Sequence, residues 1–216
     1  MSFNQLIHRR IVNKQYKENL LKSFKQSFKK GYGIETDIHA TKDHEFICFH
    51  DFTLNRIFKK KESVKNMNYS QIKKISTQNK KPNPLLKDLL KTSKNMYPLF
   101  IEIKPTLSKK LLQKLLKETS KFSKCVFISF KHENIYNLLK IKSNTKVGLS
   151  FSPLTSVKTI IKKSNYKKID CLILDKFFLK NKSIKDLKIK KYYYTIKTKL
   201  EFNKYSKNNN LIFENL

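Results

Sequence analysis

Two acidic residues, Glu35 and Asp37, stand two positions apart in the segment GIETDI. On a β-strand, residues i and i+2 point to the same face, so both carboxylates look one way while Ile34, Thr36 and Ile38 look the other way and can pack. Burying two like charges beside apolar neighbours is costly unless a partner neutralises them. A hard divalent cation with oxygen ligands is such a partner, and the pair therefore predicts a Mg²⁺ or Ca²⁺ site.

A third carboxylate and two basic groups stand at the ends of other apolar runs. Glu102 and Lys104 are also two residues apart, in the segment LFIEIKP, and Arg9 closes the first apolar run of the chain. We expect Glu102 to join Glu35 and Asp37 in a site of three carboxylates. Lys104 either only neutralises Glu102 or also holds a phosphate oxygen. Arg9 is either an ordinary surface residue or a phosphate ligand, since a guanidinium can bind phosphate through two hydrogen bonds.

His8 and His50 are the two histidines that end apolar runs. Imidazole titrates near neutral pH. Two such rings beside a carboxylate cluster favour a general acid and a general base, although a single histidine at such a place is more often structural. Asp51 either starts a turn or orients a site residue. The remaining histidines are interpreted, in chain order, as strand-edge, turn and surface residues: His39, His44 and His132.

The elements that must position these residues alternate along the chain between short apolar runs and helical patterns. Further strand-like runs occur at 125–129, 146–151, 171–174, 192–196 and 211–213. A tight turn at 41–44 predicts that the run ending at His50 folds back as a hairpin. The last helical pattern has Leu200 and Tyr205 on its apolar face.

Eight other strands then remain, most of them separated by helices. This alternation predicts a (β/α)₈ TIM barrel with a hairpin after the second strand, whose site residues lie at the carboxyl ends of the strands. An open doubly wound sheet is the alternative, and it accounts less well for site residues on so many different strands. A length of 216 residues suits one domain, expected to span residues 1–216.

The formal charge of +32 resembles that of a nucleic-acid-binding protein, but its distribution does not. Nearly all the positive charge is lysine spread through every segment, whereas a binding footprint would gather it on one arm or helix face. Arginine occurs only at positions 9, 10 and 56, alanine once and tryptophan never, while Asn, Ile, Phe and Tyr are abundant. That composition is typical of AT-rich codons, so we expect a solvated surface without specific nucleic-acid binding.

Cysteine and hydropathy patterns exclude other classes. Cys48, Cys125 and Cys171 are odd in number, far apart and embedded in apolar runs, so neither a disulfide framework nor a zinc site is expected. No apolar run approaches the length of a membrane span. The N-terminus lacks a signal-peptide core, and the expected location is the cytoplasm.

The candidate residues also carry a resemblance to a known family when their order along the chain is considered. The motifs are His8-Arg9, Glu18-Asn19-Leu20, Gly31-x-Gly33-Ile34-Glu35-x-Asp37, Thr41-Lys42-Asp43, His50-Asp51-x-Thr53-Leu54-x-Arg56, Ile101-Glu102-Ile103-Lys104 and Ser129-Phe130. Each motif is weak alone, but the ordered set covers essentially the whole chain and resembles the glycerophosphodiester phosphodiesterase family.

The resemblance implies a TIM barrel that hydrolyses glycerophosphodiesters to sn-glycerol 3-phosphate and an alcohol with a divalent cation. It implies the metal ligands Glu35, Asp37 and Glu102, the phosphate contacts Arg9 and Lys104, and the acid–base pair His8 and His50. The substrate is then a small phosphodiester. One alternative is lysophospholipase-D-like activity on lipids, which a wider apolar mouth would favour. The other is a non-catalytic basic barrel that binds polyanions, against which the intact site residues argue.

The chain departs from the family pattern at four places. Arg10 stands where glycine usually follows His-Arg, and Lys17 where proline usually precedes Glu-Asn. Near the C-terminus, YTIK at 194–197 replaces a usual WTVN, and IFEN at 212–215 replaces a usual ITD. The far wall of the pocket therefore differs from the family more than the catalytic half does, so the sequence supports the activity better than the identity of the substrate.

Overall fold

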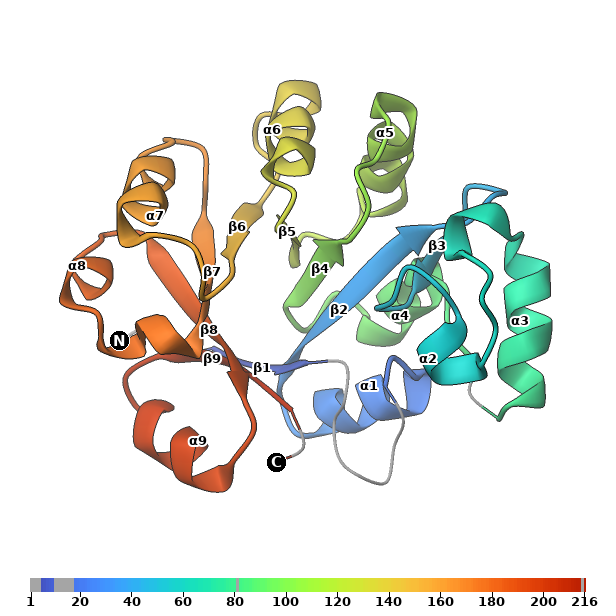
Figure 1. Cartoon of the computed structure of the whole chain (residues 1–216), viewed down its shortest axis with the longest axis horizontal. Coiled ribbons are helices and arrows are strands. Elements are labelled where there is room, and N and C mark those ends of the chain that lie inside the picture. Colours follow the sequence, from blue (N-terminus) through green and yellow to red (C-terminus); the bar gives the residue numbers. More distant parts are fainter. Residues whose placement is uncertain (1–4, 10–17, 81, 215) are drawn as a thin grey trace.

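A closed barrel of eight parallel strands forms the centre of the protein (Figure 1). The computed structural model describes residues 5–9, 18–80, 82–214 and 216. The parallel strands are β1 (Leu6–Arg9), β2 (Gly33–Ala40), β4 (Leu99–Ile103), β5 (Cys125–Ser129), β6 (Val147–Phe151), β7 (Cys171–Asp175), β8 (Lys190–Ile196) and β9 (Asn210–Phe213). Pairing of β1 with both β2 and β9 closes the sheet. The TIM barrel predicted from the alternating pattern is confirmed, and the open sheet is excluded.

The predicted hairpin follows the second strand. β3 (Phe46–Cys48) pairs antiparallel with β2. In the turn between them, the Thr41 hydroxyl donates to Asp43 Oδ1 at 2.6 Å and accepts from the Glu45 amide at 3.0 Å. Such side-chain hydrogen bonds stabilise a tight reversal of the chain, which brings the segment after β3 back beside the barrel.

Helices surround the strands (Figure 1). They are α1 (Leu21–Lys29), α2 (Asn55–Phe58), α3 (Tyr69–Gln78), α4 (Leu86–Ser93), α5 (Lys109–Glu118), α6 (His132–Ile141), α7 (Val157–Ser164), α8 (Lys182–Lys185) and α9 (Lys199–Tyr205), with 3₁₀ helices η1 (Val64–Asn66) and η2 (Lys176–Lys180). None of the described helices is long and apolar enough to cross a membrane. One expectation about a helix face was wrong, because Leu200 of α9 is exposed.

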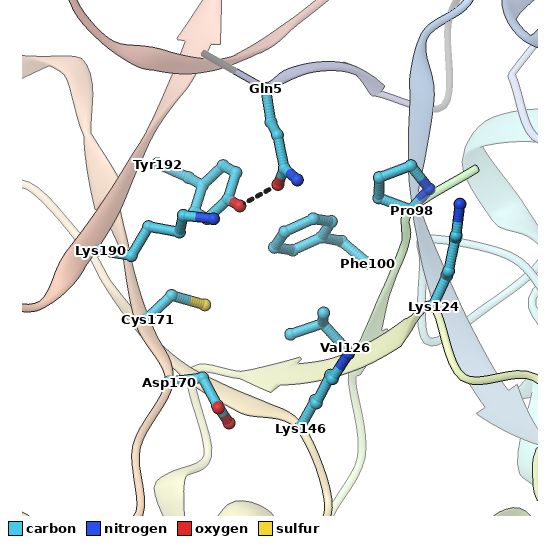
Figure 2. A pocket seen from close by; sticks show the side chains of 10 residues that line it. All are labelled: Gln5, Pro98, Phe100, Lys124, Val126, Lys146, Asp170, Cys171, Lys190 and Tyr192. Carbon is cyan, nitrogen blue, oxygen red and sulfur yellow. Dashed lines mark hydrogen bonds between the residues drawn. The ribbon is translucent and has the colours of Figure 1, made fainter. Parts of the chain in front are cut away.

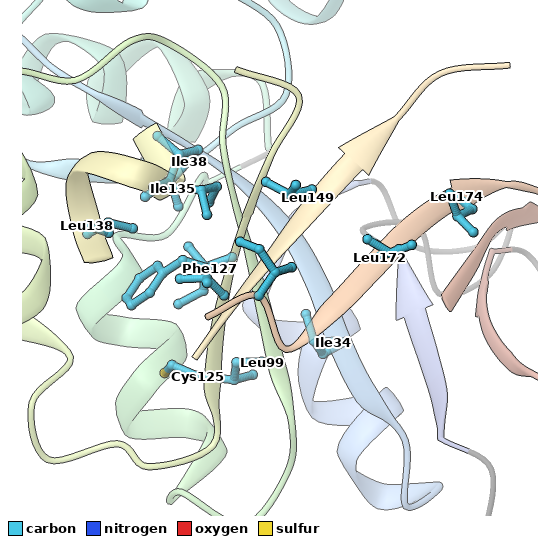
Figure 3. Close-up of a cluster of buried hydrophobic side chains, with 14 of the residues drawn as sticks. Ile34, Ile38, Leu99, Cys125, Phe127, Ile135, Leu138, Leu149, Leu172 and Leu174 are labelled. Carbon is cyan, nitrogen blue, oxygen red and sulfur yellow. The ribbon is translucent and has the colours of Figure 1, made fainter. Parts of the chain in front are cut away.

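Alternation along each strand divides the apolar side chains between two cores. Outward-facing residues such as Ile34 and Ile38 pack against the helices, and Figure 3 shows Phe127 of β5 beside Ile135 and Leu138 of α6 in this outer core. Inward-facing residues fill the barrel itself: Ile7, Phe100, Ile128, Cys171, Ile173, Tyr192 and Ile212. All three cysteines are free and buried, as the sequence predicted.

A third, smaller core lies under the segment between β3 and α4. Buried side chains from both ends of this segment meet there, among them Ile47, Phe49, Ile72 and Leu85. The sequence pattern at 55–78 indicated only a polar excursion with a few apolar positions, but the segment folds into α2, η1 and α3 around these residues. Packing of this core fixes the chain that carries His50.

The amino-terminal end of the barrel opens into a hollow of about 570 Å³. Its apolar floor and polar rim, drawn in Figure 2, consist of Gln5, Pro98, Phe100, Lys124, Val126, Lys146, Asp170, Cys171, Lys190 and Tyr192. The Lys124 and Lys146 ammonium groups donate to the carbonyls of Met96 and Ser123, at 2.8 and 3.2 Å. The cluster of potential metal ligands found among the described residues lies at the opposite end.

Candidate active site

Three carboxylates converge inside the carboxyl end of the barrel. Asp37 of β2 pairs in register with Glu102 of β4, and Glu35 lies two residues earlier on the same face of β2. One oxygen from each residue lies within 4.8 Å of the others. The exposed fractions are only 2% for Glu35, 0% for Asp37 and 5% for Glu102. The predicted convergence of these acids is therefore present in the structure.

Two cations partly balance these three negative charges. Lys104 Nζ lies 2.8 Å from Glu102 Oε1 and 3.4 Å from Asp37 Oδ1, and Arg9 Nε lies 3.4 Å from Glu35 Oε2. Burial raises the pKa of Glu102, repulsion by Asp37 raises it further, and Lys104 opposes both. Burial alone would lower the pKa of Lys104, but Asp37 and Glu102 outweigh it and raise that pKa.

The donor chemistry of this cluster fits a divalent cation. Hard cations such as Mg²⁺ and Ca²⁺ bind carboxylate oxygens, and three buried carboxylates lie together here beside two basic side chains. An added cation would relieve the repulsion that raises the pKa of Glu102. Glu35, Asp37 and Glu102 are therefore the residues that could hold a metal ion.

A fourth carboxylate, Glu214, was missed by the sequence analysis. It is buried just after β9, where Arg9 Nη1 lies 3.5 Å and Lys197 Nζ lies 3.2 Å from its carboxylate oxygens. Its spacing from the inward-facing Ile212 places it in phase with the barrel interior, and that alternation could have revealed it. Lys197 and Glu214 lie in the two C-terminal segments that depart from the family pattern, and their side chains form an ion pair at the site.

His50 is held by a chain of charged hydrogen bonds. Its Nδ1 lies 2.6 Å from Asp51 Oδ1, and Asp51 Oδ2 accepts from Arg56 Nε at 2.6 Å. Arg56 donates two further hydrogen bonds to Glu18. Burial raises the pKa of Asp51, but Arg56 and His50 outweigh it and hold that pKa below its ordinary value. Of the two roles considered for Asp51, the contacts favour orientation of the His50 ring.

His39 was interpreted as a strand-edge residue, and this was wrong. It is buried and shares the inward face of β2 with Glu35 and Asp37, as the two-residue alternation could have indicated. Its Nε2 donates to the His50 carbonyl at 3.2 Å. Burial lowers the pKa of His39 to about 4, although the hydrogen bond to His50 opposes the shift. A neutral His39 therefore fixes the backbone that carries His50.

His8 lies on the outer face of β1, and the structure does not bring it beside the acids. Its Nδ1 is 2.6 Å from Ser27 Oγ in α1, and its ring packs against Tyr32 and Phe213. The residue is fully buried. Burial, reinforced by Lys30, lowers its pKa to about 3, so the ring is neutral at neutral pH.

The space directly over the acids is small. A hollow of about 20 Å³ lies between Arg9, Glu35, Glu102, Phe130 and Tyr194, with three isoleucines below. That volume accommodates about one water molecule or ion, so a larger ligand would have to lie across the mouth of the barrel above it. The predicted departures at positions 10, 17 and 215 lie outside the described residues.

Comparisons with known proteins agree on one family. The model of the glycerophosphoryl diester phosphodiesterase family matches residues 10–203. A glycerophosphodiester phosphodiesterase from Caldanaerobacter subterraneus is 27% identical, over 64% of this chain and 63% of that protein, so the match spans less than two thirds of the relative.

Solved structures extend the likeness to the whole fold. A glycerophosphodiester phosphodiesterase from Thermotoga maritima has a TM-score of 0.81 at 19% identity, covering 99% of this chain and 95% of that one. An Oleispira antarctica phosphodiesterase, solved with the product sn-glycerol-3-phosphate, has a TM-score of 0.84 at 18% identity, covering 99% and 93%. At these identities the likeness establishes the barrel alone.

Proposed function

Because the chain belongs to the glycerophosphoryl diester phosphodiesterase family, we propose that it is a metal-dependent phosphodiesterase that releases sn-glycerol 3-phosphate and an alcohol from glycerophosphodiesters. The observation that carries this proposal is the buried cluster of Glu35, Asp37 and Glu102 beside Arg9 and Lys104 at the mouth of the barrel. Such a site combines ligands for a cation with donors for a phosphate, which are the two requirements of phosphodiester cleavage.

The three carboxylates are proposed to hold one Mg²⁺ or Ca²⁺ ion. A bound cation of this kind polarises the phosphoryl group and lowers the pKa of the attacking hydroxyl. Lys104 keeps its positive charge near neutral pH because its carboxylate neighbours raise its pKa. It can therefore neutralise a phosphate oxygen.

Arg9 is proposed to orient the diester. Its guanidinium lies between Glu35 and Glu214 at 3.4 and 3.5 Å, and these contacts restrict its movement. Arginine can donate two parallel hydrogen bonds to one phosphate, which fixes both position and direction. Binding would then already have cost the entropy of positioning the diester, so the barrier to in-line attack is lower.

His50 is proposed to move the proton. The hydrogen bond from Nδ1 to Asp51 leaves Nε2 as the nitrogen that exchanges a proton with substrate, and the carboxylate stabilises the imidazolium that forms. The attacking oxygen, from water or from the glycerol 2-hydroxyl, forms a new bond to phosphorus. The bond between phosphorus and the alcohol oxygen breaks, and the alcohol leaves with a proton. Where the 2-hydroxyl attacks, a water molecule then opens the resulting cyclic phosphate to give sn-glycerol 3-phosphate. His8 as the partner in this transfer remains a prediction from the resemblance.

A release assay tests the proposed function. The protein is incubated with glycerophosphocholine, glycerophosphoethanolamine and glycerophosphoglycerol, with EDTA or with added Mg²⁺ or Ca²⁺. We expect release of sn-glycerol 3-phosphate that EDTA abolishes and one of the cations restores. Absence of release from every diester with either cation would contradict the proposal.

A further inference from the structure

Large apolar side chains gather around one end of the barrel. Seven such side chains are exposed among the described residues. Five of them lie in segments that follow the carboxyl ends of strands, around the candidate site: Phe52, Phe130, Leu154, Phe177 and Leu200. The other two, Met96 and Tyr166, lie in loops that lead into β4 and β7 at the opposite end.

Three of the five are the most exposed and are here called the apolar arc: Leu154, Phe177 and Leu200. Their exposed fractions are 94%, 72% and 80%. They follow β6, β7 and β8, which are neighbours in the sheet. Leu154 lies in the loop before α7, Phe177 in η2 and Leu200 in the first turn of α9; α7 and α9 are labelled in Figure 1. Large apolar side chains this exposed to water are unfavourable, and several of them at one end of a molecule favour an interaction surface there.

A local hydrogen bond fixes the backbone at Phe177, the central residue of the arc. The Phe177 amide donates to Asp175 Oδ1 at 2.8 Å, and the next residue, Phe178, is buried. These contacts anchor the backbone beneath Phe177 while its own ring faces solvent.

The segment that carries Leu200 is anchored in the same way. The Glu201 amide donates to the Thr198 hydroxyl at 3.2 Å at the start of α9, and Phe202 packs against Phe213. Lys176 Nζ lies 2.6 Å from Glu201 Oε1 and connects the Phe177 and Leu200 segments. The arc is therefore a fixed feature of the surface.

Lysines accompany each apolar side chain of the arc. Exposed lysines stand within four residues of Leu154, Phe177 and Leu200 along the chain: Lys158, Lys176, Lys180, Lys197, Lys199 and Lys204. Two of them, Lys176 and Lys197, form ion pairs with Glu201 and Glu214. Apolar side chains that insert into acyl chains, flanked by lysines that meet anionic headgroups, are the combination that binds an interfacial lipid surface. A protein partner would need a matching concave face, whereas a bilayer accepts separate protruding side chains.

We propose that the apolar arc docks the protein on an anionic lipid bilayer, with the mouth of the barrel turned toward the lipid. The docking itself is independent of the activity. Its consequence would be that the mouth of the barrel receives phosphodiesters of membrane lipids, such as lysophospholipids, and this consequence rests on the proposed function. The shallow hollow above the acids, which places a diester across the mouth, suits a substrate presented from a surface.

Vesicle sedimentation tests the docking without any assay of turnover. The full chain is mixed with vesicles of phosphatidylcholine alone or of equal parts phosphatidylcholine and phosphatidylglycerol. The test variant combines Leu154→Ser, Phe177→Ser and Leu200→Ser, and the matched control combines Met96→Ser and Tyr166→Ser at the other end. We expect the partition of the test variant onto anionic vesicles to fall by about tenfold or more, and that of the control to stay within about twofold of the unmodified chain.

Two outcomes would overturn the proposal. One is equal partition of the test variant and the unmodified chain, which would assign binding to the lysines alone. The other is that the unmodified chain does not bind anionic vesicles. If the unmodified chain instead forms a concentration-dependent dimer that the test variant does not form, the arc is a surface for self-association. Circular dichroism melting of all three proteins establishes that each is folded, so that a loss of binding reports the surface.

Hydrolysis measured on the same samples tests the consequence. The test variant should cleave water-soluble glycerophosphocholine at the unmodified rate and lysophosphatidylglycerol in anionic vesicles about tenfold more slowly, in line with the lower partition. If the test variant and the unmodified chain cleave the vesicle-bound substrate at equal rates, docking does not supply the substrate. A chain that cleaves neither substrate would contradict the proposed function, while the sedimentation result would still decide the docking.

Discussion

Charge balance distinguishes the site residues from the rest of the chain. Glu35, Asp37 and Glu102 are buried together, and Lys104 and Arg9 form ion pairs with them. Carboxylates buried this close repel one another, and a bound cation would relieve that repulsion.

Replacing one metal ligand should abolish stabilisation by the metal. A ligand that binds only the folded state at about one hundred times its dissociation constant raises the free energy of unfolding by about 2.7 kcal/mol. We expect Mg²⁺ or Ca²⁺ to raise the melting temperature of the unmodified chain but not that of Asp37→Asn. The exposed acid Glu133 provides the matched control, since Glu133→Gln should respond as the unmodified chain does. An equal metal response in Asp37→Asn would remove this residue from the site.

His50 should carry proton transfer. We expect His50→Ala to lower kcat by roughly 10²–10⁴-fold, the usual contribution of a positioned acid or base, with an unchanged melting temperature. The control is His132→Ala, which removes an imidazole bonded to Ser150 and Lys163 instead. The family resemblance extends the loss of kcat to His8→Ala, but its ring is fully buried, so that variant should also melt at a lower temperature. Near-normal kcat in a folded variant would exclude that histidine from the mechanism.

His8 should also make stability depend on pH. Its pKa is lowered to about 3 in the folded protein, whereas an unfolded histidine titrates near 6.5. The unfolded chain then binds more protons between these values, so stability falls as the pH drops below about 6.5. Between pH 7 and pH 5, the unmodified chain should lose about 2 kcal/mol more than His8→Gln in urea unfolding. Equal losses would show that His8 is not buried as a neutral ring.

At the scale of elements, the period of two along β2 explains most of the site. It directs Glu35, Asp37 and His39 inward and Ile34 and Ile38 into the outer core. The same period explains why β2 begins with glycine. A Cβ at Gly33 would lie 2.7 Å from both Ile7 Cδ1 and the Pro98 carbonyl oxygen, so neighbouring strands approach too closely there for a side chain.

Gly33→Ala should therefore destabilise the barrel by about 1–3 kcal/mol, the usual cost of overpacking a core. Gly31 is the control, because asparagine tolerates its φ of +77° and a Cβ added there would meet no atom within 4 Å. Gly31→Asn should change stability by less than about 1 kcal/mol. Urea denaturation compares the two variants, and equal losses would contradict the close approach at Gly33.

The elements also show where local patterns are insufficient. The predicted strand at 125–129 coincides with β5, and the other late strands agree within a few residues. In contrast, α2, η1 and α3 were not anticipated as a folded unit, because their apolar residues form a core together with residues outside the segment, such as Ile47 and Leu85. Leu200 fits a helical apolar face by spacing alone, yet α9 turns it toward solvent.

At the scale of the whole molecule, the charge of +32 requires an explanation. The outer helices carry many lysines, and α5 alone carries four. The absence of specific nucleic-acid binding, a location in the cytoplasm and a single domain over residues 1–216 remain predictions. The first of these can be tested directly.

Binding to polyanions should be weak and strongly salt-dependent. Neutralised phosphates release counterions, so affinity falls steeply as salt rises, without any reading of sequence. In fluorescence anisotropy with labelled DNA and RNA, unlabelled competitors of any sequence should compete equally at physiological salt. Tight, sequence-selective binding under those conditions would contradict the interpretation of the charge as compositional.

The sequence by itself determined the barrel, the hairpin and the inward direction of Glu35, Asp37 and Glu102, because strand period and element order are local properties. Only the tertiary structure decided which side chains meet across strands. It joined Arg9 to Glu35 and Glu214, tied His39 to the carbonyl of His50, and turned His8 toward Ser27. These contacts join residues far apart in the chain, and their partners depend on the register of neighbouring strands, which no local pattern contains.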